Sequence, residues 1–237
     1  MEVYLVSYRQ TKEEEVTVAI QGNNILDLSF RNIIKLERLP NKVNKINLNG
    51  NNIKKLSNLS KDLTEISAVS NRIFKIEDNL PKLNKLNLSH NNITVIENLP
   101  NSLQELNLSY NYNIEKLENL PKKLKQIILS NGKLESVSKL PTNLQKIDLN
   151  NNKIRTIDVP QKVEILNLSN NDLNTFPKLF TSLIELNLSN NRLIKIINLK
   201  NFVNLESLNL ANNNLKKIEN LAPNLKYLNL SNNKIAN

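Results

Sequence analysis

Leucine and isoleucine recur at fixed intervals along most of the chain, with polar residues between them. One instance has apolar residues at Leu83, Leu86, Leu88 and Ile93 and an asparagine at Asn91. The same arrangement returns about every 20 residues as far as the C-terminal end. Apolar residues thus occupy the first, fourth, sixth and eleventh positions of a repeating unit, and asparagine is common at the ninth. Self-similarity at a short fixed period is typical of stacked repeat architectures.

The pattern predicts one short strand in each repeat, around its fourth to sixth positions. The apolar side chains should point into a core that neighbouring coils share, while the third and fifth positions face outward. About nine residues then remain before the next strand, and many of these return segments contain Leu-Pro, as at Leu80-Pro81 and Leu99-Pro100. Proline and the short length argue against a helix. They favour extended or polyproline-like segments and 3₁₀ turns.

The ninth position is asparagine in nine of eleven successive repeats. We expect its amide to turn inward and to bond backbone groups of adjacent coils that would otherwise be buried without partners. The predicted ladder consists of Asn51, Asn71, Asn91, Asn111, Asn152, Asn171, Asn191, Asn213 and Asn233. Arg31 and Gly132 take this position in the first and sixth repeats, and we predict that Asn131 replaces Gly132 through a local shift. One extra residue within 111–114 predicts a small bulge between repeats five and six.

The template L-x-x-L-x-L-x-x-N-x-L resembles the leucine-rich repeat family over about residues 23–237. This resemblance implies an α/β-type, mostly β solenoid. It would be a right-handed horseshoe with a parallel sheet on its concave side and extended or 3₁₀ segments on its convex side. The short repeats with Leu-Pro are similar to those of bacterial secreted effectors, above all at Thr175-Phe176-Pro177. The longer segment 196–205 looks more like the repeats of phosphatase regulatory subunits, so the resemblance names no specific partner.

The first 22 residues do not fit the template. Alternating apolar residues, including Val3 and Leu5 and later Val16 and Val18, flank a polar stretch. They predict two strands and a turn that cover the open edge of the first coil. We therefore expect a β-hairpin-like cap over 1–22 and one continuous domain of eleven repeats over 23–237. The template stops in mid-repeat at the C-terminal end, so an edge-to-edge homodimer stays open beside the expected monomer.

Composition and charge narrow the function. The 237-residue chain has no cysteine and one histidine, which excludes a disulfide framework, a cysteine-ligated metal site and thiol chemistry. Asp27 and Asp148 lie six strands apart, about 29 Å, which is too far for an acid/base pair. No nucleophile motif accompanies His90. We predict no enzymatic activity, no cofactor and no metal site.

The net charge of +10 is spread unevenly. At the strand positions basic residues outnumber acidic ones by only two, and most of the excess lies on the cap and the return segments, for example at Lys54-Lys55 and Lys122-Lys123. No basic aromatic groove results, so we do not expect a nucleic-acid partner. Weak, salt-sensitive nucleic-acid binding by the convex side stays an alternative.

The chain as given shows neither a signal peptide nor an apolar run long enough to span a membrane. Five N-glycosylation sequons fall at the fifth position, where glycans would block the concave face: Asn87, Asn107, Asn167, Asn187 and Asn229. We therefore expect a cytoplasmic protein, including one delivered into or expressed within a host cell.

The expected concave face is nearly uniform, with asparagine or aspartate at most fifth positions. Its exceptions gather in repeats four to six, and aromatic residues on a polar surface are typical interface anchors. The predicted partner-binding residues are His90, Tyr110, Tyr112, Ile128, Asn87 and Asn107. The sequence thus predicts a protein–protein interaction module for an unidentified protein, with virulence or host interaction implied by the resemblance. A purely structural, consensus-like scaffold without an evolved partner is the alternative.

Overall fold

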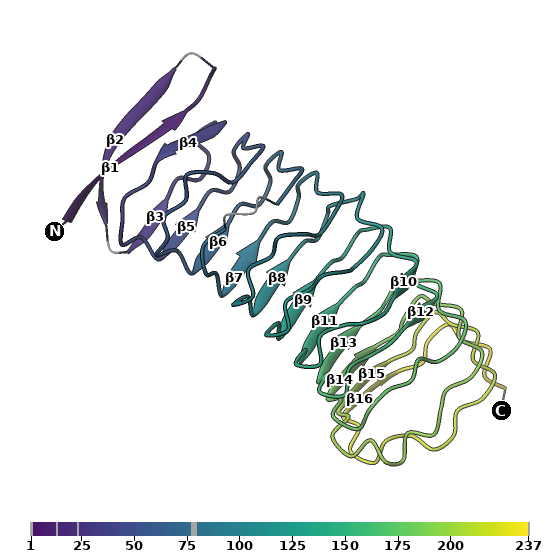
Figure 1. Ribbon diagram of the computed structural model, residues 1–237. Helices are drawn as coiled ribbons and strands as arrows, with labels where there is room; N and C mark the ends of the chain where they lie inside the picture. The colour runs from purple at the N-terminus through teal and green to yellow at the C-terminus, as the bar shows by residue number, and fades with distance from the viewer. Residues whose placement is uncertain (1, 13, 23, 77–79, 237) are drawn as a thin grey trace. The chain divides into compact units, whose positions relative to one another are not determined.

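The computed structural model describes residues 2–12, 14–22, 24–76 and 80–236. The chain divides into two compact units, and each is described by itself. The first unit is Met1–Ile114 with Asn119–Leu124, and the second is Glu115–Glu118 with Lys125–Asn237. Each unit is a stack of coils in which one short strand alternates with a return segment (Figure 1). Within the described residues there is no helix that could cross a membrane.

Each coil contributes one strand to a parallel ladder. The first unit contains β3 (Ile25–Asp27), β5 (Lys45–Asn47), β6 (Glu65–Ser67), β7 (Lys85–Asn87) and β8 (Glu105–Asn107). The second contains β9 (Gln126–Ile128), β11 (Lys146–Asp148), β13 (Ile165–Asn167), β14 (Glu185–Asn187), β15 (Ser207–Asn209) and β16 (Tyr227–Asn229). Equivalent positions pair in register, as Ile46 does with Ile66. The predicted mostly β repeat fold with parallel strands is confirmed.

The core lies between each strand and its return segment. Leu86, Leu88 and Ile93 are at most 2% exposed, and the equivalent residues of other coils are similarly buried. Burial of each such side chain stabilises the fold by about 1.5–3 kcal/mol. The third and fifth positions flank the buried fourth position and face outward, and we call this outward surface the strand face. The two-residue alternation of a strand therefore separates the core from the strand face.

The return segments consist of turns and short strands. In several coils the Pro carbonyl accepts from the first-position amide three residues later, as from Leu103 to Pro100 at 3.0 Å and from Leu124 to Pro121 at 3.1 Å. Leu-Pro therefore starts the turn that leads into the next strand. The strands on this side are β4 (Lys35–Arg38), β10 (Ser136–Val137) and β12 (Thr156–Ile157), of which β10 and β12 pair in parallel.

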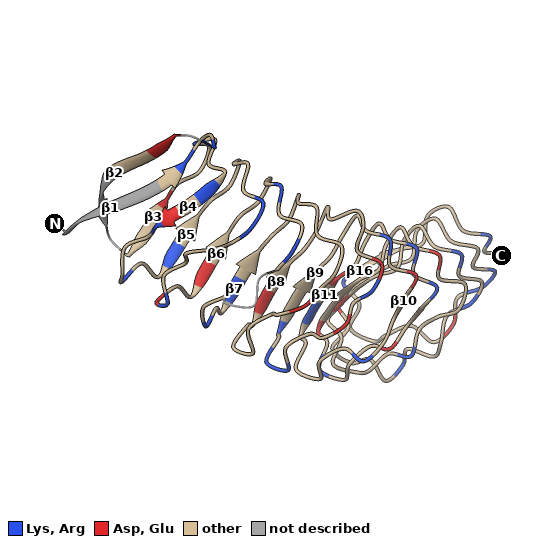
Figure 2. Ribbon diagram, turned by 45° about the horizontal axis from the view of Figure 1, so that its top comes forward, with Lys and Arg blue, Asp and Glu red and all other residues tan. Residues whose placement is uncertain are grey.

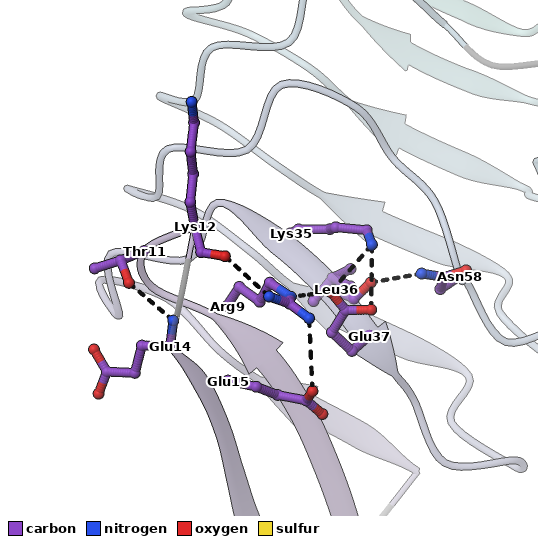
Figure 3. Close-up of polar contacts among 9 residues, drawn as sticks. All are labelled: Arg9, Thr11, Lys12, Glu14, Glu15, Lys35, Leu36, Glu37 and Asn58. Carbon is purple, nitrogen blue, oxygen red and sulfur yellow. Dashed lines mark hydrogen bonds and ion pairs between the residues drawn. The ribbon is translucent and has the colours of Figure 1, made fainter.

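An antiparallel hairpin precedes the first coil. It consists of β1 (Glu2–Arg9) and β2 (Glu15–Gly22), and β1 also pairs with β4. Arg9 Nε contacts Glu37 Oε1 at 2.6 Å, and Glu37 also pairs with Lys35 at 3.1 Å. Asn58 of the next coil donates to the Leu36 carbonyl at 2.7 Å (Figure 3). Tyr8, 2% exposed, adds its side chain to the core. The hairpin is thus joined to the return side of the first coil, through β4.

Candidate binding site

The ninth-position asparagines tie each coil to the one before it. The Asn91 Oδ1 accepts from the Ile73 amide at 2.8 Å, and its Nδ2 donates to the carbonyls of Ala68 at 2.9 Å and Leu88 at 3.0 Å. Bonds of the same kind occur at all nine asparagines: Asn51, Asn71, Asn91, Asn111, Asn152, Asn171, Asn191, Asn213 and Asn233. The amide thus satisfies a buried donor and two buried acceptors, which is a structural task.

The two exceptions at the ninth position have different surroundings. The Arg31 carbonyl accepts from Gln10 of the hairpin at 3.0 Å. The expected shift of Asn131 into the place of Gly132 is wrong. Asn131 keeps the eighth-position backbone, with φ of 58° and its amide donating to Asn150 O, because the regular ladder to the next coil fixes its register.

The fifth-position side chains form the turns that end the strands. The Oδ1 atoms of Asn87 and Asn107 accept from the backbone amides of Ser89 at 3.1 Å and Ser109 at 3.0 Å. This is an Asx-type turn, which asparagine and aspartate form readily. In the first coil the Ser29 hydroxyl and amide both donate to Asp27, and these bonds lower the pKa of that carboxyl. The uniform asparagine at this position therefore has a local structural cause.

The eighth position has a left-handed backbone in every coil. Its φ ranges from 53° at Asn151 to 66° at Gly50. Glycine and asparagine tolerate this conformation, whereas other side chains are strained in it. His90 and Tyr110 adopt it with φ of 56° and 58°. This requirement was not predicted from the sequence, although asparagine at the eighth position of all the later repeats was a signal of it.

Three of the predicted residues form an aromatic cluster in the first unit. The rings of His90 and Tyr110 stack with centroids 4.0 Å apart and planes 13° from parallel. Tyr112 meets the edge of Tyr110 at 6.1 Å, and 58% of Tyr112 is exposed. The extra residue between repeats five and six forms a turn in which the Ile114 amide donates to Asn111 O. That turn keeps Ile114 in the core while Tyr112 stays at the surface.

Ile128 belongs to the second unit. It is half-buried on β9 and pairs with Asp148 of β11. The strand face of this unit contains a hollow of about 290 Å³, whose lining includes Lys146, Glu185 and Tyr227. The hollow is a second candidate surface that sequence reasoning did not find, because its residues are separated by whole repeats.

Charges on the strand face of the first unit are paired. Lys45 contacts Glu65 at 2.9 Å, and Lys85 contacts Glu105 at 3.0 Å. Figure 2 shows the alternation as blue and red along β5, β6, β7 and β8. The hydrogen bond and charge of Glu105 raise the pKa of Lys85. The third position is thus a charge ladder between adjacent strands, with little net charge.

Family models described as leucine-rich repeat match residues 79–95, 143–161, 162–183, 204–223 and 222–237. The fold of the chain is a leucine-rich-repeat fold. No curated protein sequence matches the chain.

Among solved structures this chain is similar to YopM from Yersinia enterocolitica, with 26% identity and a TM-score of 0.65 over 84% of this chain and 53% of YopM. It is similar to the leucine-rich repeat domain of APL1B, at 26% identity and a TM-score of 0.66, over 81% of this chain and 62% of that one. A Shigella effector domain matches at 25% identity and a TM-score of 0.55, over 63% of this chain and 70% of that one. The chain therefore spans about half the length of YopM.

Proposed function

We propose that this leucine-rich-repeat protein is a protein-interaction module whose principal contact is the aromatic cluster of His90, Tyr110 and Tyr112. Repeat stacks of this kind commonly present extended surfaces for binding. The shared core and the asparagine ladder fix the strands, so ordering the surface on binding costs little entropy.

One observation carries the proposal. His90 and Tyr110 occupy left-handed positions, φ 56° and 58°, where asparagine would be less strained. Strained residues that cluster and remain exposed are typical of functional sites. Asn87 and Asn107, on the strands of the same coils, complete the proposed contact on this unit. Ile128 is a further proposed contact on the second unit.

The site of action is part of the same proposal. YopM from Yersinia pestis and the Shigella protein, to which this chain is similar, are bacterial effectors. We therefore place the proposed partner inside a host cell, and host-cell lysates are the first source to search.

The test is quantitative capture from such lysates by the immobilised full chain. A triple variant, His90→Asn with Tyr110→Asn and Tyr112→Asn, removes all three rings. At positions 90 and 110 it introduces the residue that the second unit has at the left-handed position. Tyr227→Asn, which removes an exposed aromatic ring from the second unit, is the matched control. A partner lost by the triple variant and retained by the control supports the proposal.

Two outcomes contradict it. A partner that the triple variant retains and Tyr227→Asn loses moves the site to the hollow of the second unit. The absence of any captured protein from several lysates favours the alternative of a consensus-like scaffold without an evolved partner.

A further inference from the structure

The eighth positions of the first unit form a regular row along consecutive coils. This aromatic row consists of Phe30, Gly50, Ser70, His90 and Tyr110. The amides of the first four members donate to the seventh-position carbonyl of the next coil at 2.9–3.1 Å, as from Phe30 to Asn49 and from Ser70 to Ser89. These bonds keep neighbouring members about 4.8 Å apart.

One end of the row is a single exposed ring. Phe30 is 80% exposed, the largest exposed fraction among the exposed large apolar side chains of the described residues. A Cβ added at Gly50 would collide with Cδ1 and Cε1 of Phe30. The Phe30 ring therefore occupies the space of the missing Gly50 side chain and stands at the level of that coil.

The other end of the row is the stacked pair of His90 and Tyr110. From the Gly50 coil to the His90 coil there are two steps, or about 10 Å, and the member of the row between them is Ser70, which has a small side chain. A planar group in contact with a ring on each side needs about 7 Å. The row therefore leaves room for one planar side chain above Ser70.

The surroundings of the row are cationic. Positions seven to ten of these five coils contain Arg31 and Arg72, both exposed, and no aspartate or glutamate. Three acids lie on the strand face of this unit. Asp27 accepts hydrogen bonds from Ser29 and also attracts Arg31, whereas Glu65 and Glu105 are held by lysines of adjacent strands. Guanidinium groups favour carboxylates because they offer several parallel donors. The charge of this strip thus complements an acidic ligand.

We propose that the aromatic row binds an acidic peptide segment of the partner protein, with one aromatic side chain of that segment inserted above Ser70, between the rings of Phe30 and His90. Carboxylates on either side of the inserted ring pair with Arg31 and Arg72. This inference rests on the proposed function and adds the chemistry of the partner. Single-stranded nucleic acid also stacks on aromatic rings, but a phosphate backbone is held by many cations, and the row offers two.

The absence of tryptophan from the chain makes a direct test possible. The probe is the peptide Gly-Ser-Glu-Asp-Trp-Asp-Glu-Ser-Gly, whose tryptophan emission is followed as the full-length chain is added. We expect a saturable change that weakens about tenfold in Phe30→Asn, because one stacking partner is lost. Asparagine holds the same backbone at Asn170 and Asn190, so this variant should fold.

The charge contribution is tested separately. Arg72→Gln should weaken binding of the same peptide severalfold and reduce its salt dependence. Arg192→Gln, which changes the tenth-position arginine of the second unit, is the matched control and should bind like the wild type. A peptide with alanine in place of tryptophan should bind at least tenfold more weakly than the probe.

The inference is overturned if Phe30→Asn binds like the wild type, if the alanine peptide binds equally well, or if no peptide binds. Binding of oligouridylate that Phe30→Asn abolishes, without peptide binding, would assign the row to nucleic acid and also overturn it. If the peptide fails while a captured protein still depends on His90, Tyr110 and Tyr112, the proposed function stands and only this inference falls.

Discussion

The two units share the ninth position and differ at the eighth. Asn91 in the first unit and Asn191 in the second make the same bonds to the preceding coil. One residue earlier, the second unit has asparagine in all six coils: Asn131, Asn151, Asn170, Asn190, Asn212 and Asn232. The first unit has five different residues there, three of them with rings.

The backbone conformation explains what this difference means. All eleven eighth positions have φ between 53° and 66°, where asparagine and glycine are favoured. The second unit follows that preference, whereas the first departs from it at Phe30, Ser70, His90 and Tyr110. Each departure costs about 1 kcal/mol relative to asparagine. This cost, which recurs on one unit and accompanies a group of three rings, is the observation on which the proposed binding role rests.

The largest effect should come from the position that the units share. Asn91→Ala leaves the Ile73 amide and two carbonyls of the core without their partner, and Asn191→Ala does the same in the second unit. Each should lower the free energy of unfolding by about 3 kcal/mol. Urea unfolding followed by circular dichroism measures both. A small loss of unfolding free energy in either variant would mean that the asparagine ladder does not stabilise the two units equally.

A transplant into the second unit should have the next largest effect. Asn190→His with Asn212→Tyr puts the stacked pair on adjacent coils of that unit, where the Asn190 amide donates to Ala211 O. We expect a loss of about 2 kcal/mol, since two asparagines leave a conformation that suits them. Urea unfolding measures the difference in the free energy of unfolding between this variant and the wild type, with Asn190→Ser as a milder control. Unchanged stability would mean that backbone strain does not explain the aromatic cluster.

The smallest effect concerns the hairpin, which only the first unit has. Arg9 and then Lys35 lower the pKa of the Glu37 carboxyl from its usual 4.5. The stabilisation that the Glu37 carboxylate gives to the hairpin is therefore complete above pH 4.5. It is lost as the pH falls through the lower pKa that Glu37 has in the folded protein. We expect the protection factor of the Ile34 amide, which donates to Arg9 O, to fall over that range.

Two comparisons check this pH effect. In Glu37→Gln the protection of Ile34 should already be reduced at neutral pH and should show no further acid step. The Lys153 amide of the second unit, which donates to Leu134 O, should stay protected in both proteins. An acid step of equal size in Glu37→Gln would assign it to another carboxyl.

The sequence predicted the repeat fold well because its core positions are set by spacing alone. Leu86, Leu88 and Ile93 are buried wherever the template puts them. Backbone conformation was harder to predict, since φ at the eighth position is fixed by the ladder to the next coil. The error at Asn131 came from counting asparagines without that constraint. The place of Phe30 could not be predicted from the sequence, because its contact with Gly50 joins residues that lie 20 positions apart.

The most direct test of the central claim is one double variant, His90→Asn with Tyr110→Asn, measured for both stability and binding. If the rings are kept for a partner although they strain the backbone, the free energy of unfolding of the variant should be higher than that of the wild type by about 1–2 kcal/mol. The variant should also bind the acidic tryptophan peptide at least tenfold more weakly. A variant that is less stable than the wild type and binds the peptide equally well would contradict the account.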